Sequence, residues 1–241
     1  MKHQSNILAL KYRPLNFKDL IGQEYLVETI QKSIQQNKIP NAYIFTGIRG
    51  VGKTTTARIV AKMLNCTVFD KNNNPDLINC EQAKAITEDR HPDVIEIDAA
   101  SNTSVENARE IIENVKYNPV LGKYKVYIVD EVHMLSKSAF NALLKTLEEP
   151  PPHSKFIFAT TEISKVPITI LSRCQRFDLR RVEKKTLSDF LKSIAKKEDI
   201  TISTQALNLI VKASDGSVRD SLSILDQANI FKSQKEIQVE E

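Results

Sequence analysis

The chain has 241 residues, 41% of them hydrophobic, which suits one large domain or a large domain with a small companion. Lys and Arg number 34 against 30 Asp and Glu, and a net charge of +4 is too small to indicate nucleic-acid binding by itself. No stretch approaches the roughly 20 apolar residues that a membrane span requires. The N-terminus (MKHQSN) lacks a signal-peptide core, so we predict a soluble, cytoplasmic protein with no membrane partner.

The first motif along the chain is a glycine-rich loop at residues 47–54 (GIRGVGKT). It follows an apolar run at 42–45, which predicts a strand, and it opens a helical pattern at 55–64. Glycines permit the backbone conformations in which successive N–H groups face a phosphate at a helix N-terminus. The pattern predicts that Lys53 reaches the β and γ phosphates of a nucleotide and that the Thr54 hydroxyl binds Mg2+. An ordinary glycine-rich turn is the alternative.

A polar segment at 71–79 contains three consecutive asparagines and a proline, and it predicts a loop or an irregular excursion. Cys66 and Cys80 flank this segment, with no cysteine or histidine between them. Because structural zinc needs four good ligands, we predict that zinc is absent. A disulfide would be unusual in a reducing cytoplasm. We expect Cys174, the third cysteine, to be a small buried apolar residue.

The second chemical motif ends the run 125–131 (KVYIVDE), in which β-branched and aromatic residues precede two carboxylates. Such a run is typical of a buried parallel strand. Beside a phosphate loop, Asp130 would hold Mg2+ through water and Glu131 would polarise an attacking water. The pair favours hydrolysis over phosphoryl transfer to a small metabolite. A strand that simply ends in solvated acids is the alternative.

Three further apolar runs, at 94–97, 156–159 and 175–179, predict more strands. Helical periodicity is clear at 105–115 and at 138–149, and three prolines end the second of these helices. Strands that alternate with helices indicate an α/β domain with a parallel sheet flanked by helices, which we place at residues 1–179.

After residue 179 the pattern changes to helices alone, which predicts a domain boundary near Arg180 and a small helical domain at 180–241. A capping box at Thr186 begins a helix that runs to about residue 197. A second helix is predicted at 204–213, and a third begins at Ser217.

Several short segments complete a wider pattern: KYRP at 11–14 with Phe17, IGQE at 21–24, DAAS at 98–101, DEVHML at 130–135, FNALLKTLEEPP at 140–151, ATT at 159–161, SRC at 172–174 and GSVRD at 216–220. With the phosphate loop, they resemble the γ/τ family of clamp-loader subunits of bacterial DNA polymerase III, which are AAA+ ATPases. The resemblance covers nearly the whole chain. It implies an AAA+ P-loop fold with a five-stranded parallel sheet, followed by a three-helix lid.

The resemblance implies three further roles. Thr161, or alternatively Thr160, matches sensor 1, a polar group at a strand tip that could orient water or touch the γ-phosphate. Arg173 matches the arginine finger, which acts in trans on a nucleotide held by a neighbouring subunit. Arg219 matches sensor 2, through which the lid could sense the γ-phosphate. The alternatives are a threonine that caps a turn, an ordinary surface arginine, and a pair of Arg219 with an adjacent aspartate, at 215 or 220.

With Lys53 and Glu131 these residues form the expected catalytic set. His133 is expected to be structural or coupling, because Glu131 already fills the role of the base. Tyr12 could equally be an ordinary core aromatic. The nucleotide contacts implied by the motifs and the resemblance are Tyr12, Arg13, Ile21, Gly47, Ile48, Arg49, Gly50, Val51, Gly52, Lys53, Thr54, Thr55, Val218 and Arg219.

The implied cofactors are ATP or ADP with Mg2+, and the implied partners are other clamp-loader subunits, the sliding clamp and primer-template DNA. Lys145 and Lys165 resemble positions that face DNA phosphates, although a solvated lysine is the common alternative. Clamp contacts are expected near residues 132–138. Relatives carry a cysteine zinc module after the phosphate-loop helix, of which only Cys66 and Cys80 remain here.

In relatives a helical collar domain follows the lid, and this sequence stops where that domain should begin. We therefore expect a monomeric fragment that binds ATP and hydrolyses it slowly, because Arg173 has no neighbour to serve. The expected function is ATP-driven opening of the sliding clamp and its loading onto primed DNA during chromosomal replication. A P-loop helicase or translocase, and a nucleotide-binding scaffold subunit with little catalysis, are the alternatives.

Overall fold

A computed structural model describes residues 7–71, 74–101, 105–231 and 236–237. Its centre is a five-stranded parallel sheet, as predicted, and the structure sets the strand order β2-β3-β4-β1-β5. The strands are β1 (Ala42–Thr46), β2 (Val94–Asp98), β3 (Lys125–Asp130), β4 (Ser154–Thr160) and β5 (Gln175–Asp178). The strand predicted at 125–131 is one residue too long, because Glu131 leaves the extended conformation with a left-handed φ of 46°.

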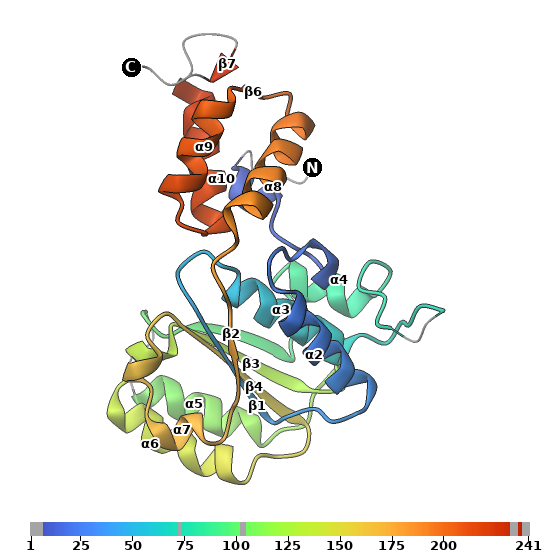
Figure 1. Ribbon diagram of the computed structural model, residues 1–241. Helices are drawn as coiled ribbons and strands as arrows, with labels where there is room; N and C mark the ends of the chain where they lie inside the picture. The colour runs from blue at the N-terminus through green and yellow to red at the C-terminus, as the bar shows by residue number, and fades with distance from the viewer. Residues whose placement is uncertain (1–6, 72–73, 102–104, 232–235, 238–241) are drawn as a thin grey trace.

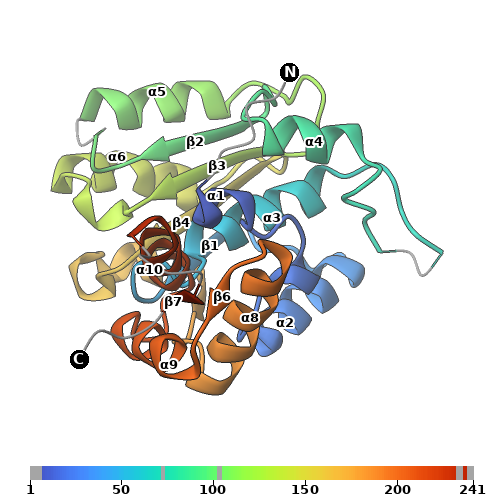
Figure 2. The ribbon, with the colours of Figure 1, turned by 90° about the horizontal axis from the view of Figure 1, so that it is seen from above.

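Helices cover both faces of the sheet (Figures 1 and 2). On one face lie α2 (Glu24–Gln35) and α3 (Lys53–Asn65), with α4 (Glu81–Thr87) packed against α3. On the other lie α5 (Val105–Val115), α6 (Lys137–Glu148) and α7 (Ile168–Leu171). Because both faces are covered, β1 and β4 are buried at every position, and their apolar stretches at 42–45 and 156–159 are continuous.

The prediction omitted α2 and α4, although α2 carried a readable signal. Its apolar residues recur at helical spacing, and Leu26 and Ile30 bury that stripe against the sheet. The described residues of the predicted loop, 71 and 74–79, contain no helix, as predicted, and one isolated bridge joins Phe69 to Pro75; residues 72–73 lie outside the described part of the chain.

The three predicted lid helices are α8 (Lys184–Lys197), α9 (Thr204–Ala213) and α10 (Val218–Phe231). The capping box at Thr186 was a wrong prediction, because α8 begins two residues earlier, after Glu183, and Thr186 lies inside its first turn. The predicted start of α10 is confirmed, since Ser217 Oγ accepts the N–H of Asp220. The lid is not helical alone, because β6 (Thr201–Ile202) pairs in parallel with β7 (Glu236–Ile237).

The N-terminal helix α1 (Leu8–Lys11) packs with the lid rather than with the sheet (Figure 1). Leu8 is buried in the same apolar cluster as the lid helices, and its N–H donates to Asp226 on α10 (3.4 Å). Tyr12 and Ile21 pack against that cluster too. The segment before α2 thus connects the lid to the part of the chain that contains the sheet. The domain boundary near Arg180 stays a prediction.

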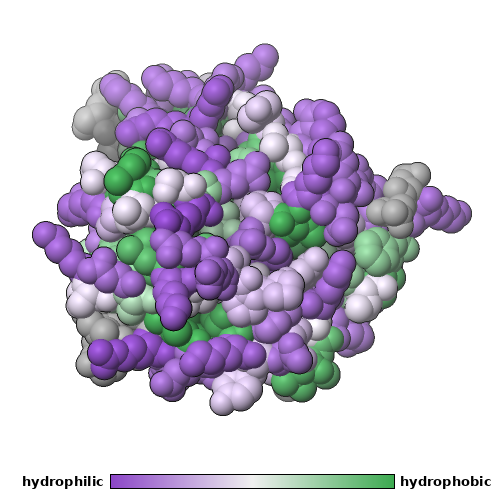
Figure 3. All heavy atoms as spheres, turned by 90° about the horizontal axis from the view of Figure 1, so that it is seen from below, coloured by the Kyte–Doolittle hydropathy of each residue, from purple (hydrophilic) through white to green (hydrophobic). Residues whose placement is uncertain are grey.

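Short 3-10 helices lie at Phe17–Asp19 (η1), Val132–Met134 (η2) and Ile163–Lys165 (η3). The last two closely follow β3 and β4, so they lie at the edge of the sheet formed by the carboxyl ends of the strands. The face of the molecule opposite the lid is mostly hydrophilic, with small apolar patches (Figure 3). Among the helices of the described residues, none is long and apolar enough to cross a membrane.

Candidate nucleotide-binding site

The phosphate loop connects the end of β1 to the start of α3. Gly52, the N-cap of α3, has a φ of 107°, a conformation that L side chains rarely adopt. This geometry lets the loop turn directly into the helix, whose first N–H groups and dipole favour an anion. Val51 is buried in the apolar cluster beneath, whereas Arg49 is exposed. The side chain of Val51 therefore anchors the loop to the core, and we expect the loop's backbone N–H groups to bind the ligand.

Lys53 folds back over this loop. Its ammonium donates to the carbonyl oxygens of Gly47 and Ile48, both at 3.0 Å, and the residue is only 5% exposed. Burial lowers the pKa of Lys53, while the nearby carboxylates of Glu131 and Asp130 act in the opposite direction. A buried cation beside a helix N-terminus suits a phosphate, which would add the counter-charge that backbone carbonyls provide only in part.

Oxygen atoms for a magnesium ion meet between α3 and β3. Thr54 Oγ1 donates to Asp130 Oδ2 at 2.5 Å. The other oxygen, Asp130 Oδ1, accepts the N–H of Glu131 at 2.9 Å, which orients the carboxylate. Hydroxyl, carboxylate and phosphate oxygens are the ligands that Mg2+ prefers. The paired oxygens therefore fit the predicted ion.

The predicted base and the predicted sensor 1 are in direct contact. Glu131 Oε2 accepts hydrogen bonds from the Thr161 hydroxyl (2.9 Å) and from the Thr161 N–H (3.1 Å). Thr160 contacts the imidazole of His133 instead, with Oγ1 2.9 Å from Nδ1. The two threonines thus have different partners: Thr161 contacts Glu131, and Thr160 contacts His133.

The lid touches the phosphate loop at the start of α10. The N–H of Arg219 donates to the carbonyl oxygen of Gly50 at 3.2 Å. The Arg219 side chain is exposed and forms no ion pair with any residue that the structure describes. Asp215, one of its alternative partners, pairs with Arg181 instead. Val218 packs partly into the lid cluster.

The residues predicted to contact the adenine and ribose lie in two places: Arg13 contacts α3, whereas Tyr12 and Ile21 pack against the lid. Arg13 Nε donates to Thr55 Oγ1 (3.2 Å) on α3. Tyr12 and Ile21 face the lid cluster, and the Tyr12 hydroxyl donates to Glu198. Burial and this carboxylate raise the pKa of Tyr12 to about 12. In this conformation Tyr12 therefore packs with the lid, and its contact with adenine remains a prediction.

Arg173 lies just after α7, and its side chain is 31% exposed. Its guanidinium pairs with Glu148 and donates to the carbonyl oxygen of Thr169 (2.6 Å). Neither partner belongs to the phosphate loop. The contact with Glu148 had not been predicted, and the LEEPP sequence offers no local signal for it. Cys174 is only partly buried, less than expected, and burial raises its pKa to about 12.

The remaining predicted residues lie outside this cluster. Lys145 and Lys165 are exposed on α6 and η3. Cys66 and Cys80 are buried against Leu77 and Ala83. Burial raises the pKa of Cys66 to about 12, whereas the pKa of Cys80 is lowered, because the hydrogen bond with Cys66 and backbone hydrogen bonds outweigh the effect of burial. Within the described part of the chain, no group of three or more His, Cys, Asp and Glu side chains is arranged to hold a metal ion. The absence of zinc remains a prediction, which elemental analysis of the purified chain would test.

Comparison with known proteins places this geometry in a family. Residues 22–183 match the family model described as "DNA polymerase III, delta subunit", and residues 186–234 match "DNA polymerase III clamp loader subunit, ATPase lid domain". The RuvB Holliday junction branch migration motor of Thermotoga maritima has a similar fold, with a TM-score of 0.68 at 18% identity, over 94% of this chain and 69% of that one.

Relatives of higher identity carry the γ/τ names. The chain is 50% identical to DNA polymerase III subunit tau/gamma of Haemophilus influenzae over 92% of its length, 47% identical to subunit tau of Escherichia coli over 92%, and 49% identical to subunit tau of Bacillus subtilis over 91%. It spans 32%, 34% and 39% of those proteins, respectively. The chain therefore belongs to the family of DNA polymerase III clamp-loader subunits, with γ/τ subunits among its relatives.

Proposed function

We propose that this chain is the ATP-hydrolysing part of a replicative clamp-loader subunit. The observation that carries the proposal is the arrangement around β3. Asp130 meets the phosphate-loop residue Thr54 on one side, and the adjacent Glu131 meets Thr161 on the other. In this proposal a metal-binding carboxylate, a base and a hydroxyl that holds the base lie at the ends of neighbouring strands.

Each residue has a chemical task in this proposal. The loop amides and Lys53 bind the β and γ phosphates, and Thr54 and Asp130 hold Mg2+. When bound, the ion neutralises the charge that develops on the transferred phosphoryl group. Glu131 orients the attacking water and accepts its proton, while Thr161 holds the Glu131 carboxylate in place.

Two arginines would connect hydrolysis to assembly. Arg173 contacts no phosphate-loop residue of its own chain, which supports action on a neighbouring subunit's nucleotide. Arg219 sits on a helix whose backbone touches Gly50, so a γ-phosphate bound by its guanidinium would bias the angle between lid and sheet. Arg13, Tyr12 and Ile21 would form the adenine side of the site.

The proposed partners follow from family membership. They are further clamp-loader subunits, the sliding clamp and the phosphates of primer-template DNA, which Lys145 and Lys165 would contact in the bacterial cytoplasm. ATP binding would assemble the subunits and open the clamp, and hydrolysis would release the clamp on DNA.

The first test is the affinity of the purified chain for fluorescent ATP and ADP analogues with Mg2+, for wild type and Lys53→Ala. A hydrogen bond to a charged group contributes about 1.5–3 kcal/mol, so we expect at least a ten-fold weaker affinity in the variant. Lys84→Ala removes an exposed lysine from α4 and should bind like wild type. Equal binding by Lys53→Ala would contradict the phosphate site.

The full-length protein, reconstituted with its partner subunits, then separates the alternatives. ATPase activity stimulated by clamp and primed DNA supports the clamp loader. Strand separation would instead indicate a helicase, and nucleotide binding without turnover would indicate a scaffold.

A further inference from the structure

A groove on the surface of the lid is lined mainly by lysines. It runs between α8 and α9 and has a volume of about 530 Å³. Lys184, Lys185 and Lys192 line it from α8 and Lys212 from α9, together with a single acid, Asp189. We call it the lysine groove. None of these residues has a task in the proposed hydrolysis of ATP.

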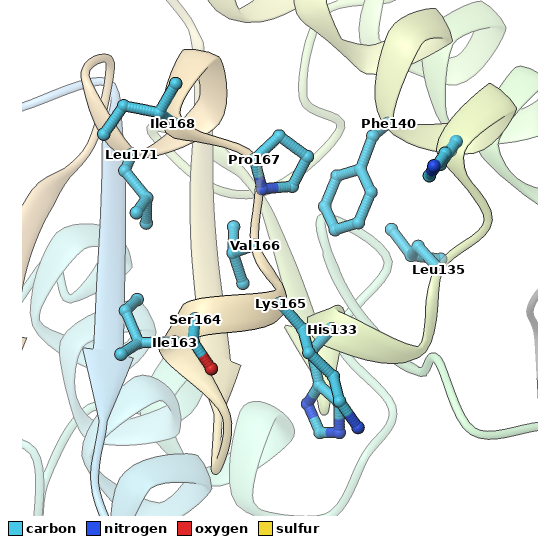
Figure 4. Close-up of a pocket in the computed structure, with 11 residues that line it drawn as sticks. His133, Leu135, Phe140, Ile163, Ser164, Lys165, Val166, Pro167, Ile168 and Leu171 are labelled. Carbon is cyan, nitrogen blue, oxygen red and sulfur yellow. The ribbon is translucent and has the colours of Figure 1, made fainter.

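The lysine groove differs in chemistry from a second groove, of about 610 Å³, beside η3 and α7. Figure 4 shows that apolar side chains, among them Phe140, Val166 and Ile168, form much of the wall of that second groove. Apolar walls do not indicate which partner covers them. A groove with one predominant sign of charge, in contrast, selects a partner of the opposite sign.

Within the described part of the chain, the four lysines of the groove have no counter-charge. All four residues are exposed, and none of their ammonium groups forms an ion pair or a hydrogen bond with a residue that the structure describes. Two other acids of the lid pair elsewhere, Glu198 with Lys11 and Asp215 with Arg181. The positive charge of the groove is therefore available to a partner.

The helix α8 concentrates charge at its beginning. It has five lysines and one aspartate among its 14 residues. Lys184 and Lys185 lie in the first turn, which contains no acid. Because the positive end of the helix dipole lies there, two cations at this place are unfavourable in the free chain. An anion bound at this end of the groove would relieve that repulsion.

The walls of the groove are packed on the core of the lid. Leu187 and Leu191 from α8 are buried in one apolar cluster with Leu207 and Ile210 from α9. Val211 belongs to the same cluster and also lines the groove. The lysines therefore stand on two helices whose relative position is fixed by packing, and the groove is formed before any partner binds.

The spacing along α8 suits a short segment of chain. Lys184, Ser188 and Lys192 recur at intervals of four residues, which places them on one face of the helix over about 12 Å. An extended peptide of about four residues spans the same length. Lys212 faces this line from the other helix, so a bound segment would meet lysines on both sides.

The lining of the groove favours carboxylates over nucleic acid. Proteins bind single-stranded nucleic acid with cations and with aromatic side chains on which the bases stack, and arginine matches phosphate in a bidentate geometry. Among the described residues that line the groove there is neither an aromatic residue nor an arginine. Asp189 would repel a continuous row of phosphates, whereas neutral residues can separate the carboxylates of a peptide. Ser188 and Asn208 can form hydrogen bonds with such neutral parts.

We propose that the lysine groove binds a short acidic segment of a partner protein, whose carboxylates pair with Lys184, Lys185, Lys192 and Lys212. The site contains no residue of the phosphate loop, so the inference goes beyond the proposed function and does not depend on it. Because salt screens exposed ion pairs, the affinity should fall as the ionic strength rises.

The test is the fluorescence anisotropy of a short labelled peptide of alternating glutamate and serine, titrated with the purified chain at low salt. Lys185→Glu/Lys192→Glu should weaken binding at least about ten-fold, because each exposed ion pair contributes up to about five-fold and repulsion replaces two of them. Lys185→Gln/Lys192→Gln adds no negative charge, so its affinity should lie between those of the wild type and the glutamate variant.

The matched control is Lys38→Glu/Lys71→Glu, which changes the net charge equally at two exposed lysines outside the groove. It should bind the peptide within about two-fold of wild type, since distant exposed charges are largely screened. The melting temperature and the affinity for an ATP analogue should stay at the wild-type values in all three variants, because no lysine that is changed has a described ion-pair partner.

The outcomes are distinct. Equal weakening in the groove and control variants would show a response to net charge alone and would overturn the proposal. Equal binding of a peptide with glutamine in place of glutamate would do the same. Oligothymidylate or tripolyphosphate that binds the groove more tightly than the peptide would replace the acidic segment by a phosphate ligand. Failure of the wild type to bind the ATP analogue would contradict the proposed function alone.

Discussion

The N–H of Arg219 donates a hydrogen bond to the carbonyl oxygen of Gly50, which joins the first turn of the last lid helix to the phosphate loop. The approach is so close that a Cβ added to Gly50 would lie 2.2 Å from Ser217 Oγ and 3.0 Å from Arg219 Cβ. Gly50 also has a left-handed φ of 74°. Nucleotide bound in the loop would therefore act directly on the position of the lid.

We expect Gly50→Ala to weaken nucleotide binding and to destabilise the fold. The left-handed backbone alone costs about 1–2 kcal/mol for a residue with a Cβ, and the contact with Ser217 adds to it. Denaturant titration and analogue binding measure the two effects. The double variant with Ser217→Ala removes the clashing oxygen, so its destabilisation should be smaller than the sum of the two single changes. If the destabilisation of the double variant equals the sum of the two single destabilisations, the contact between Gly50 and Ser217 does not contribute to the effect.

Thr54→Val should remove the magnesium dependence of nucleotide affinity. The substitution keeps the shape of the side chain but deletes the hydroxyl that lies 2.5 Å from Asp130 Oδ2. We expect ADP to bind the variant and the wild type equally in a chelator, and the gain on adding Mg2+ to fall about ten-fold or more. Thr29→Val, at a partly buried threonine of α2 away from the phosphate loop, serves as the control. An undiminished magnesium effect would exclude Thr54 as a ligand.

Arg173→Ala should lower ATPase activity in the complete assembly but not in the isolated chain. An arginine finger contributes about 10³-fold or more to turnover, so the complete assembly of full-length subunits should lose most of its ATPase activity. The isolated chain, in which Arg173 pairs with Glu148, should hydrolyse ATP at an unchanged rate. Arg176→Ala, a nearby exposed arginine that pairs with Asp178, is the matched control. An equal loss in the isolated chain would mean that Arg173 acts within its own subunit.

Lys62 predicts a pH dependence of stability. It is 3% exposed, and burial, with Arg58 and Arg13 nearby, lowers its pKa from 10.5 to about 8. Below pH 8 both folded and unfolded chains are protonated here, and the folded state bears the full cost of the buried charge. Between about 8 and 10.5 the unfolded chain binds more protons, so this contribution to the free energy of unfolding rises with pH.

Lys62→Met should therefore stabilise the chain near neutral pH, by on the order of 3 kcal/mol for a shift of this size. Its advantage over wild type should shrink as the pH approaches 10. Denaturant titrations at two pH values measure this difference, and Lys38→Met, at an exposed lysine, should show no such trend. An advantage that is independent of pH would mean that the buried ammonium is not the cause.

Much of the fold could be predicted because its signals are local. The buried strands are continuous apolar runs, and the glycine spacing of residues 47–54 defines a phosphate loop wherever it occurs between a strand and a helix. The lid helix α10, which begins directly after Ser217, was predicted from this capping residue. The start of α8 was missed because Thr186 also offers a plausible cap, and only packing decides between two such starts.

The sequence by itself determined the chemistry of the predicted site. It indicated which residues could hold phosphate, metal and water, and that they follow the ends of predicted strands. The tertiary structure decided which of these side chains meet. Thr161 reaches Glu131 across 30 residues, Arg173 reaches Glu148 across 25, and Leu8 reaches Asp226 across 218. Local propensity and periodicity carry no information about such contacts, because they depend on how the sheet orders its strands and on where the lid packs.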